Sequence, residues 1–473
     1  MAASMNTSGA RSGGTEIGQL IDERPLGAMQ IWVIIACAMV ILLDGYDIQT
    51  MSLVVPTLIE ELGAPREAFG LALSAAIIGM LVGYSIVAPL GDKFGRRPLL
   101  IAGMALVGVA SIATAYAIEL APVFKPLITL MEPLLKLLHI TTDPNLFSFV
   151  LLRFITGIGL GASLPNGTAL TSEYVPSKNR AFLIGMMYLS VALGALIAGF
   201  IAPPILDQLG WHWIFLIGGF IPLGICLILL VSIPESVRLL LSKGQNDPRI
   251  ARLVRRLARD VDPATVYAEK HENVKSQNVF ALLSREYWPR TLLLWCIFIF
   301  NLFVLYTLIG WLPQILTEAG WTRGEALRGS VMIQAGGIIG GLIIARFIDR
   351  GKTVPAMAVG YTLTVIAFAL FLVLPATVPI WYTLLLVIGG GISGAQVSLN
   401  SLAVIFYPPV IRATGAGWAN TMGRFGAISG PLVSGMATAS FALQPIQQLT
   451  FLIPPTLVCI VGILLLSRVW KPD

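Results

Sequence analysis

The sequence predicts an all-α polytopic membrane protein whose twelve transmembrane helices form two six-helix halves related by pseudo-symmetry. Three observations predict this fold class. The 473 residues are 56% hydrophobic and only 12% charged, with a mean hydropathy of +0.82, which is not the composition of a soluble globular protein. Apolar runs of about 20 residues, enough to cross a bilayer as helices, recur twelve times along the chain. Short motifs from the first six runs return in the second six.

The chain opens with a small, polar segment, residues 1–28, which we expect to be a disordered cytoplasmic tail because it lacks the apolar core of a secretory signal. An N-terminal half (29–233), a C-terminal half (291–468) and a short cytoplasmic tail (469–473) follow. The expected spans are residues 29–55, 68–90, 98–118, 147–170, 181–204, 213–233, 291–312, 327–348, 355–375, 379–406, 413–439 and 447–468.

A basic linker, residues 234–290, divides these spans six and six. Such a cluster between membrane spans indicates the cytoplasmic side, and we expect no nucleic-acid partner. With both termini in the cytoplasm, most of the 31 lysines and arginines lie inside. The distribution therefore predicts a multi-pass protein of the cell inner membrane. The few basic residues left outside are Arg66, Lys125, Lys136, Arg323 and Arg328.

Residues 119–146 are the one apolar stretch that we do not count as a span. Their apolar residues follow a helical period, but the stretch is short and contains Pro126 and Pro133. We expect an amphipathic helix on the outer surface. Counting it as a span would invert every later helix and remove the charge asymmetry.

The internal repeat supports the two-half architecture. The segment from Ala88 to Gly95 is echoed by Ala345 to Gly351, and Tyr174 to Ala181 is echoed by Tyr407 to Ala413. The offsets of the two echoes differ by about 25 residues, as an insertion at 119–146 would cause. Duplicated halves place a substrate near the middle of the bilayer between them.

Two carboxylates, Asp44 and Asp47, lie well inside the first span. Three residues apart, they share one helix face, and each costs roughly 2.5–3.5 kcal/mol in a bilayer centre on insertion scales. We expect proton-coupling residues that face a polar cavity. The alternative interpretation is that the span is misplaced and the aspartates lie at a loop edge.

Two arginines, Arg153 and Arg424, also fall inside spans. At 1.5 Å per residue, both arginines and Asp44 lie at roughly one level, about 18–22 Å above the inner boundary. Since arginine suits bidentate capture of a carboxylate, we expect both to bind an anionic substrate. The alternative is a pair of Arg–Asp bridges that only hold helices together.

Other polar positions extend these predictions. The loop from Gly91 to Pro98 joins the second and third spans, and its echo makes a cytoplasmic gate the expected role of Asp92, Arg96, Asp349 and Arg350, although each loop alone could be any basic loop. Polar or aromatic residues within the second-half spans are candidate substrate contacts, the alternative for each being a helix–helix hydrogen bond. These are Tyr306, Trp311, Gln396 and Asn400.

Enzymatic and metal-binding functions are disfavoured by what the sequence holds. The 4 cysteines lie in apolar runs without paired spacing, so they indicate neither a disulfide framework nor a metal site. No nucleophile–base pair stands out. We therefore expect no enzyme activity, no cofactor, no metal and no obligate protein partner, and only the lipid bilayer as a permanent surrounding.

At these residues the chain resembles the major facilitator superfamily, and within it the aromatic acid:proton symporters. The resemblance covers about residues 29–468. It rests on the loop at 91–97, the half-repeat, Asp44-Gly-Tyr-Asp47, the run from Arg153 to Gly161, the segment Leu164 to Tyr174, and the stretch from Arg412 through Arg424 to Pro431. The chain departs from the family in having Ala88 where the loop motif usually begins with glycine, and in segment 119–146.

The resemblance implies that protons and a small aromatic acid anion, such as a hydroxybenzoate, are imported together by alternating access. It also implies that the paired aspartates and arginines are functional residues. Two other functions stay open at this point. One is a proton-coupled exporter of amphiphiles. The other is a non-transporting receptor or chemosensor, although the basic linker is too short for a soluble signalling domain.

Overall fold

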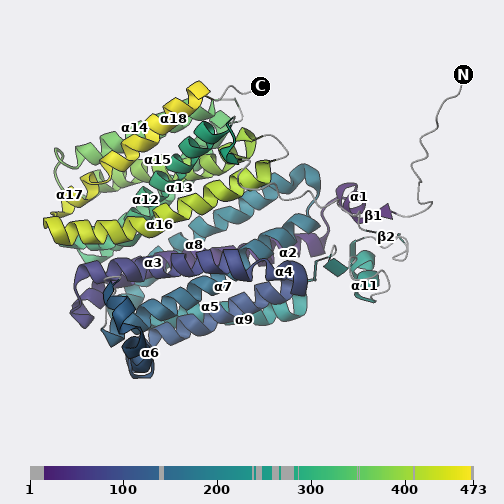
Figure 1. Cartoon of the computed structure of the whole chain (residues 1–473), viewed down its shortest axis with the longest axis horizontal. Helices are drawn as coiled ribbons and strands as arrows, with labels where there is room; N and C mark the ends of the chain where they lie inside the picture. The colour runs from purple at the N-terminus through teal and green to yellow at the C-terminus, as the bar shows by residue number, and fades with distance from the viewer. Residues whose placement is uncertain are drawn as a thin grey trace, which may run out of the picture.

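The computed structural model describes residues 15–137, 143–236, 239–240, 248–257, 261, 266–267, 282–285, 287–348, 350, 352–407 and 411–469. Within these ranges the chain is dominated by long helices that run roughly parallel to one another (Figure 1). Asp349, one of the predicted gate residues, lies outside the described residues, as do residues 1–14 of the predicted tail.

Six long helices build the N-terminal half. They are α2 (Ala28–Leu62), α3 (Arg66–Val82), α5 (Arg96–Ala115), α7 (Pro144–Tyr174), α8 (Arg180–Gln208) and α9 (His212–Ser232). The C-terminal half consists of α12 (Trp288–Glu318), α13 (Arg323–Ile348), α14 (Thr353–Leu370), α15 (Val378–Phe406), α16 (Arg412–Phe441), α17 (Pro445–Thr450) and α18 (Ile453–Val469).

Eleven helical segments of the described chain are long and apolar enough to cross a membrane. The twelfth span is α16, whose 30 residues include Arg424 and many glycine, serine and threonine residues that lower its hydropathy. The predicted fold class, with twelve spans in two halves, is confirmed. The last span is divided into α17 and α18 because Pro454 and Pro455 have no N–H to continue the helix.

Short elements lie at the two ends of the bundle. Helix α6 (Ala117–Leu137) begins two residues before the predicted insert 119–146 and covers most of it. It lies at the opposite end from α11 (Pro248–Leu257) of the linker (Figure 1). It is not among the described helices that qualify as spans. Part of the predicted disordered tail is structured: β1 (Thr15–Glu16) pairs with β2 (Val266–Tyr267), and α1 (Ile17–Asp22) buries Leu20 and Ile21.

The two halves meet along three helix pairs. Helix α3 packs against α16, α8 against α13, and α2 against α12, and Figure 1 shows the C-terminal helices lying side by side with the N-terminal ones. Each pair joins one helix from each half, so the interface is built from α2, α3 and α8 on one side and α12, α13 and α16 on the other.

Glycine allows the closest helix contacts within each half. A Cβ atom at Gly157 on α7 would lie 1.9 Å from the carbonyl oxygen of Ala76 on α3, and one at Gly426 on α16 would lie 1.9 Å from that of Ile299 on α12. No larger side chain fits at either place without moving a backbone.

The second predicted span, residues 68–90, is helical through Val87 but not α-helical throughout. After α3, residues Gly83–Val87 form one turn of π-helix, and α4 (Leu90–Phe94) follows. Gly83 packs directly on α7, where an added Cβ would lie 2.5 Å from the Ile158 carbonyl oxygen. A π-turn inside a helix frequently marks a functional site, and this one contains Tyr84.

Candidate functional site

Asp47 and Arg153 form a closed ion pair inside the N-terminal half. The Arg153 Nη1 and Nη2 atoms donate to Asp47 Oδ1 and Oδ2 at 2.7 and 2.6 Å. Arg153 is 1% exposed and Asp47 6%, and the ring of Phe215 lies 5.8 Å from the guanidinium carbon. Each charge therefore has its partner in a bidentate geometry. This geometry is the one expected of an Arg–Asp bridge that holds helices together, which was the alternative to substrate binding by Arg153.

Asp44, one turn earlier on α2, is in a different situation. It is 6% exposed, and its Oδ1 atom is buried without a hydrogen-bond partner in the described part of the chain. Its charge interacts with that of Arg424, which comes from the other half. Burying an unpaired carboxylate is costly, so this position is more readily explained by a function than by stability.

Arg424 on α16 is half-buried and lies among aromatic side chains. Its guanidinium carbon lies 5.4 Å from the centre of the Tyr84 ring, and the side chains of Tyr306, Tyr188 and Asp44 also lie in its neighbourhood. Among the described residues no carboxylate lies within ion-pair distance of it. Within the described part of the chain, the contacts of this guanidinium are thus with tyrosines and not with a paired carboxylate.

Tyr84 and Tyr188 were not among the residues predicted from the sequence. Tyr84 comes from the π-turn of the second span and Tyr188 from α8, where its hydroxyl lies 3.0 Å from that of Thr168. A tyrosine inside an apolar run is too common to stand out. The sequence singles out Tyr306 as a candidate contact, but it holds no signal that points to these two tyrosines of the other half.

The predicted contacts Gln396 and Asn400 belong to a chain of hydrogen bonds within the C-terminal half. Tyr361 Oη donates to Asn301 Oδ1 at 3.0 Å, Asn301 Nδ2 donates to Gln396 Oε1 at 2.8 Å, and Gln396 Nε2 lies 3.4 Å from Asn400 Oδ1. Asn400 is exposed and Gln396 half-buried, whereas Tyr361 is buried. The chain runs from the helix core to an open surface.

A side-chain hydrogen bond joins α2 to α13 across the interface of the halves. Gln334 Nε2 on α13 donates to Gln49 Oε1 on α2 at 3.3 Å. Gln49 follows Asp47 by two residues and is itself buried. The two glutamine side chains therefore link the halves directly.

Trp311 lies apart from this cluster in the observed state. It is fully buried, its indole nitrogen donates to the Pro431 carbonyl oxygen at 2.9 Å, and the guanidinium carbon of Arg66 lies 4.6 Å from its ring centre. Its ring face is therefore occupied by a side chain of the opposite half.

Ion pairs join the halves at the end of the bundle that carries α6. Arg66 Nη1 on α3 donates to both carboxylate oxygens of Glu318 on α12, at 2.8 and 2.6 Å, and Arg66 Nη2 donates to Gln448 Oε1 at 2.8 Å. Arg323 donates to the Thr57 hydroxyl and lies 4.0 Å from Asp207. Bonds from both halves thus hold this end closed.

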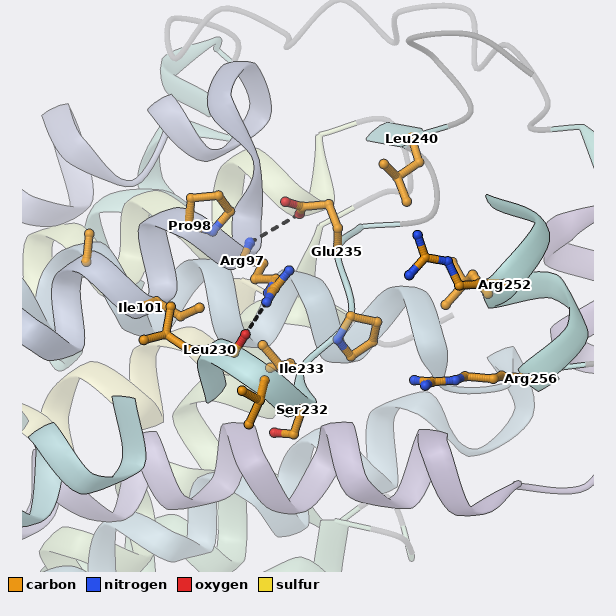
Figure 2. A pocket seen from close by; sticks show the side chains of 14 residues that line it. Arg97, Pro98, Ile101, Leu230, Ser232, Ile233, Glu235, Leu240, Arg252 and Arg256 are labelled. Carbon is orange, nitrogen blue, oxygen red and sulfur yellow. Dashed lines mark hydrogen bonds between the residues drawn. The ribbon is translucent and has the colours of Figure 1, made fainter. Parts of the chain in front are cut away.

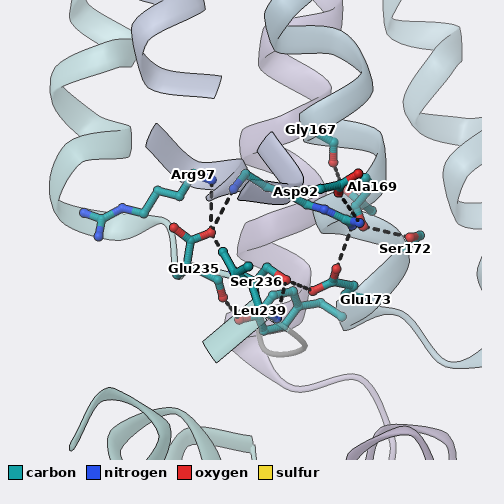
Figure 3. A network of polar contacts seen from close by, with 12 residues as sticks. Asp92, Arg97, Gly167, Ala169, Ser172, Glu173, Glu235, Ser236 and Leu239 are labelled. Carbon is teal, nitrogen blue, oxygen red and sulfur yellow. Dashed lines mark hydrogen bonds and ion pairs between the residues drawn. The ribbon is translucent and has the colours of Figure 1, made fainter. Parts of the chain in front are cut away.

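At the opposite end, the side chains of the predicted gate residues Asp92 and Arg96 form ion pairs, among the described residues, within the N-terminal half. Figure 3 shows Asp92 beside the network that contains Glu173 and Glu235. Arg96 Nη1 pairs with Glu173 Oε1 at 2.6 Å, and its Nη2 atom lies 3.4 Å from the exposed Asp92. Arg350, from the echo of this loop, is exposed. The described residues show no ion pair between the halves at this end.

Two glutamates that organise this network were not among the residues predicted from the sequence. Glu235 Oε1 accepts from the backbone N–H groups of Arg96 and Arg97 at 3.1 and 3.2 Å, which caps α5 (Figure 3). Glu173 also accepts from the Ser236 hydroxyl at 2.6 Å. Both acids stand at the end of an apolar run, where sequence alone does not separate a helix-end residue from a solvated charge.

A helical bundle of two six-span halves, with unpaired charge held at their interface, defines a membrane transporter rather than an enzyme. The family model of the Major Facilitator Superfamily matches residues 37–431, and the chain belongs to this superfamily. Proteins of similar sequence are transporters as well. The 4-hydroxybenzoate transporter PcaK of Pseudomonas putida is 32% identical over 462 residues, covering 97% of each chain. The gallate transporter of Pseudomonas putida is 30% identical over 425 residues, covering 89% of this chain and 88% of that one.

Solved structures share the fold at low sequence identity. The inward-open xylose transporter XylE from Escherichia coli aligns with a TM-score of 0.69 and 16% identity, covering 94% of this chain and 97% of that chain. A bacterial homologue of the human lysosomal transporter Spinster, in an inward-facing conformation, aligns with a TM-score of 0.68 and 16% identity, covering 95% and 100%.

Proposed function

We propose that this protein is a secondary transporter that imports a small aromatic carboxylate, of the hydroxybenzoate type, together with protons. The names of the relatives at 32% and 30% identity, a 4-hydroxybenzoate transporter and a gallate transporter, support this substrate class. The proposal includes an inner-membrane location with both termini in the cytoplasm, which the distribution of basic residues supports.

The observation that carries the proposal is the contrast in pairing between the two buried arginines. Arg153 is neutralised by Asp47 inside one half, whereas Arg424 lies at the interface of the halves beside three tyrosines and without a carboxylate hydrogen bond from the described residues. A substrate carboxylate would supply the missing anion in charge-assisted bonds. The rings of Tyr84 and Tyr306 would contact its aromatic face.

Proton coupling is assigned to the two aspartates of α2. Asp44 is buried with an oxygen that accepts no hydrogen bond, so protonation would remove the cost of its charge. Ionised Asp44 and the substrate anion would both be attracted to Arg424, so protonation of Asp44 would leave the charge of Arg424 to the substrate. Asp47 would respond through its bond to Arg153, because a change of charge on Asp47 frees that guanidinium.

The observed ion pairs favour alternating access in which the halves rock about the site. Arg66–Glu318 closes the end that the charge distribution places outside, while Asp92, Arg96 and Glu173 bond within one half at the other end. We assign Asp92, Arg96, Asp349 and Arg350 to the cytoplasmic gate in the state that closes that end. Gln396, Asn400 and Trp311 remain proposed substrate contacts for other states of the cycle.

The proposal is tested by uptake in proteoliposomes with an imposed pH gradient, inside alkaline. We expect accumulation of labelled 4-hydroxybenzoate above its outside concentration, collapse of that accumulation with a protonophore, and no accumulation of cyclohexanol or 4-hydroxybenzamide. Accumulation only when the gradient is reversed would identify the exporter. Binding without any flux would identify the receptor.

A further inference from the structure

A pocket of about 730 Å³ lies at the linker end of the bundle, away from the central site. It is formed where α5 begins, where α9 ends, and where the linker helix α11 folds back beside them (Figure 2). Three arginines line it, Arg97 from α5 and Arg252 and Arg256 from α11. The transport mechanism proposed above uses none of these three side chains.

The pocket carries an excess of positive charge that the described residues do not neutralise. Arg252 and Arg256 are exposed and form no ion pair with the described residues. Arg97 donates through Nη2 to the Leu230 carbonyl oxygen, but its Nε atom is buried without a partner in the same part of the chain. The one acid in the lining, Glu235, is occupied by backbone N–H groups.

Helix α11 holds its arginines in place through its opposite face. Ile250, Leu253 and Val254 are 1%, 5% and 0% exposed, and they pack in one apolar cluster with Leu20 and Leu240. The helix is therefore amphipathic, with an anchored apolar side and a basic side. Figure 2 shows Arg252 and Arg256 extending from α11 toward the end of α9.

The remaining wall of the pocket is apolar and continues onto the outside of the bundle. Leu230 and Val231, the last large residues of α9, are 47% and 88% exposed, although both belong to a membrane-spanning helix. Ile101 and Ile233 line the floor. A ligand here would meet guanidinium groups on one side and bilayer-facing aliphatic side chains on the other.

We propose that this pocket binds the phosphate group of an anionic phospholipid. Guanidinium groups match phosphate oxygens in charge and in bidentate geometry, and basic pockets between membrane helices at the cytoplasmic side suit lipid headgroups. The exposed Leu230 and Val231 favour a lipid over a soluble phosphate, because they offer a surface to the attached acyl chains. The bound lipid would fasten α11 to the end of α9.

The test measures lipid binding to the full-length protein by native mass spectrometry from detergent micelles. Phosphatidylglycerol and phosphatidylcholine are titrated separately. We expect the wild type to retain phosphatidylglycerol preferentially. R252A/R256A should weaken that binding about 30-fold, as two basic residues near an anionic surface predict, whereas R252K/R256K should keep part of it.

A matched control removes the same charge from the same end of the molecule. Lys93 and Arg255 are exposed and do not line the pocket, so K93A/R255A should change phosphatidylglycerol affinity by only a few fold. Because the substituted side chains are exposed, thermal unfolding in lipid-free detergent should match the wild type in both doubles.

Three outcomes would overturn the proposal. Equal losses in the two alanine doubles would show general surface electrostatics, with no site. Equal retention of the two lipids by the wild type would show that the pocket has no preference for an anionic phospholipid. Displacement of phosphatidylglycerol by millimolar inorganic phosphate would show that the pocket takes a soluble anion. None of these readouts depends on transport of an aromatic acid.

Discussion

Arg153 in the N-terminal half and Arg424 in the C-terminal half carry the same charge within membrane-spanning helices, but they are stabilised in different ways. Arg153 is 1% exposed and donates two hydrogen bonds to Asp47 of its own half. Arg424 is half-buried, faces the ring of Tyr84 across the interface, and has no ion-pair partner among the described residues.

One protein thus contains two kinds of buried arginine, one paired within a half and one at the interface of the halves. An ion pair within one half moves with that half, so a movement of the halves relative to each other does not by itself separate the two charges. A cation at the interface of two halves changes its surroundings when the halves move. Its free energy therefore depends on the conformation and on any bound anion, which is the condition for coupling.

The largest expected effect is on the closed pair. D47L should lower the free energy of unfolding by about 3–5 kcal/mol, because it leaves the Arg153 guanidinium buried and unpaired. The double variant D47L/R153M replaces both charges with apolar side chains and should recover most of the loss. Thermal unfolding of the purified proteins measures both effects. If D47L alone unfolds at the same temperature as the wild type, the Asp47–Arg153 pair does not stabilise the N-terminal half.

The folded double variant also sharpens the proton hypothesis for Asp47. If Asp47 relays protons, D47L/R153M should bind 4-hydroxybenzoate but fail to accumulate it under a pH gradient. Normal gradient-driven accumulation by this variant would restrict Asp47 and Arg153 to a structural role.

The next effect is on substrate binding at the open cation. R424A should nearly abolish binding, and R424K should weaken the affinity for 4-hydroxybenzoate by about 10–100-fold, because lysine cannot reproduce planar bidentate bonds to a carboxylate. Calorimetric titration of the purified R424K protein measures this, with unfolding temperature as the folding control. Unchanged affinity, together with unchanged discrimination against 4-hydroxybenzamide, would exclude Arg424 from the site.

Asp44 allows coupling to be separated from binding. D44N keeps the size of the side chain but cannot be ionised, so gradient-driven accumulation should fall to the equilibrium ratio while exchange of labelled for unlabelled substrate continues. Both fluxes are measured in the same proteoliposomes. Full accumulation by D44N would assign the coupling proton elsewhere.

The smallest effect concerns the aromatic face opposite Arg424. Y84A removes a ring 5.4 Å from the guanidinium carbon and should weaken substrate affinity by about 2–30-fold, the range of a cation–π contact. Y84F keeps the ring and should stay within about threefold of the wild type. If Y84F loses as much as Y84A, the hydroxyl is the group that matters and the ring contact is incidental.

Much of the architecture was predictable because it follows from local properties of the chain. Apolar run length and charge distribution predicted the spans, and the two-half arrangement is confirmed by the family model and by the shared fold. The π-turn at Gly83–Val87 was not predictable, because Gly83 packs on α7, a contact between segments far apart in the sequence. The span at 413–439 was predicted, although the composition of α16 is too polar to qualify by hydropathy.

The exceptional residues can be recognised from the sequence alone: two aspartates and two arginines in apolar helices, each too costly to be there without a reason. Which of them pair depends on how the helices pack. Asp47 and Arg153, 106 positions apart in the sequence, form a hydrogen bond, whereas Asp44, one turn away on the same helix, has an oxygen without a hydrogen-bond partner among the described residues. The cost of a buried charge depends on its apolar surroundings, which can be recognised from the sequence. The choice of partner depends on helix rotation and packing to within an ångström or so, which only the assembled bundle fixes.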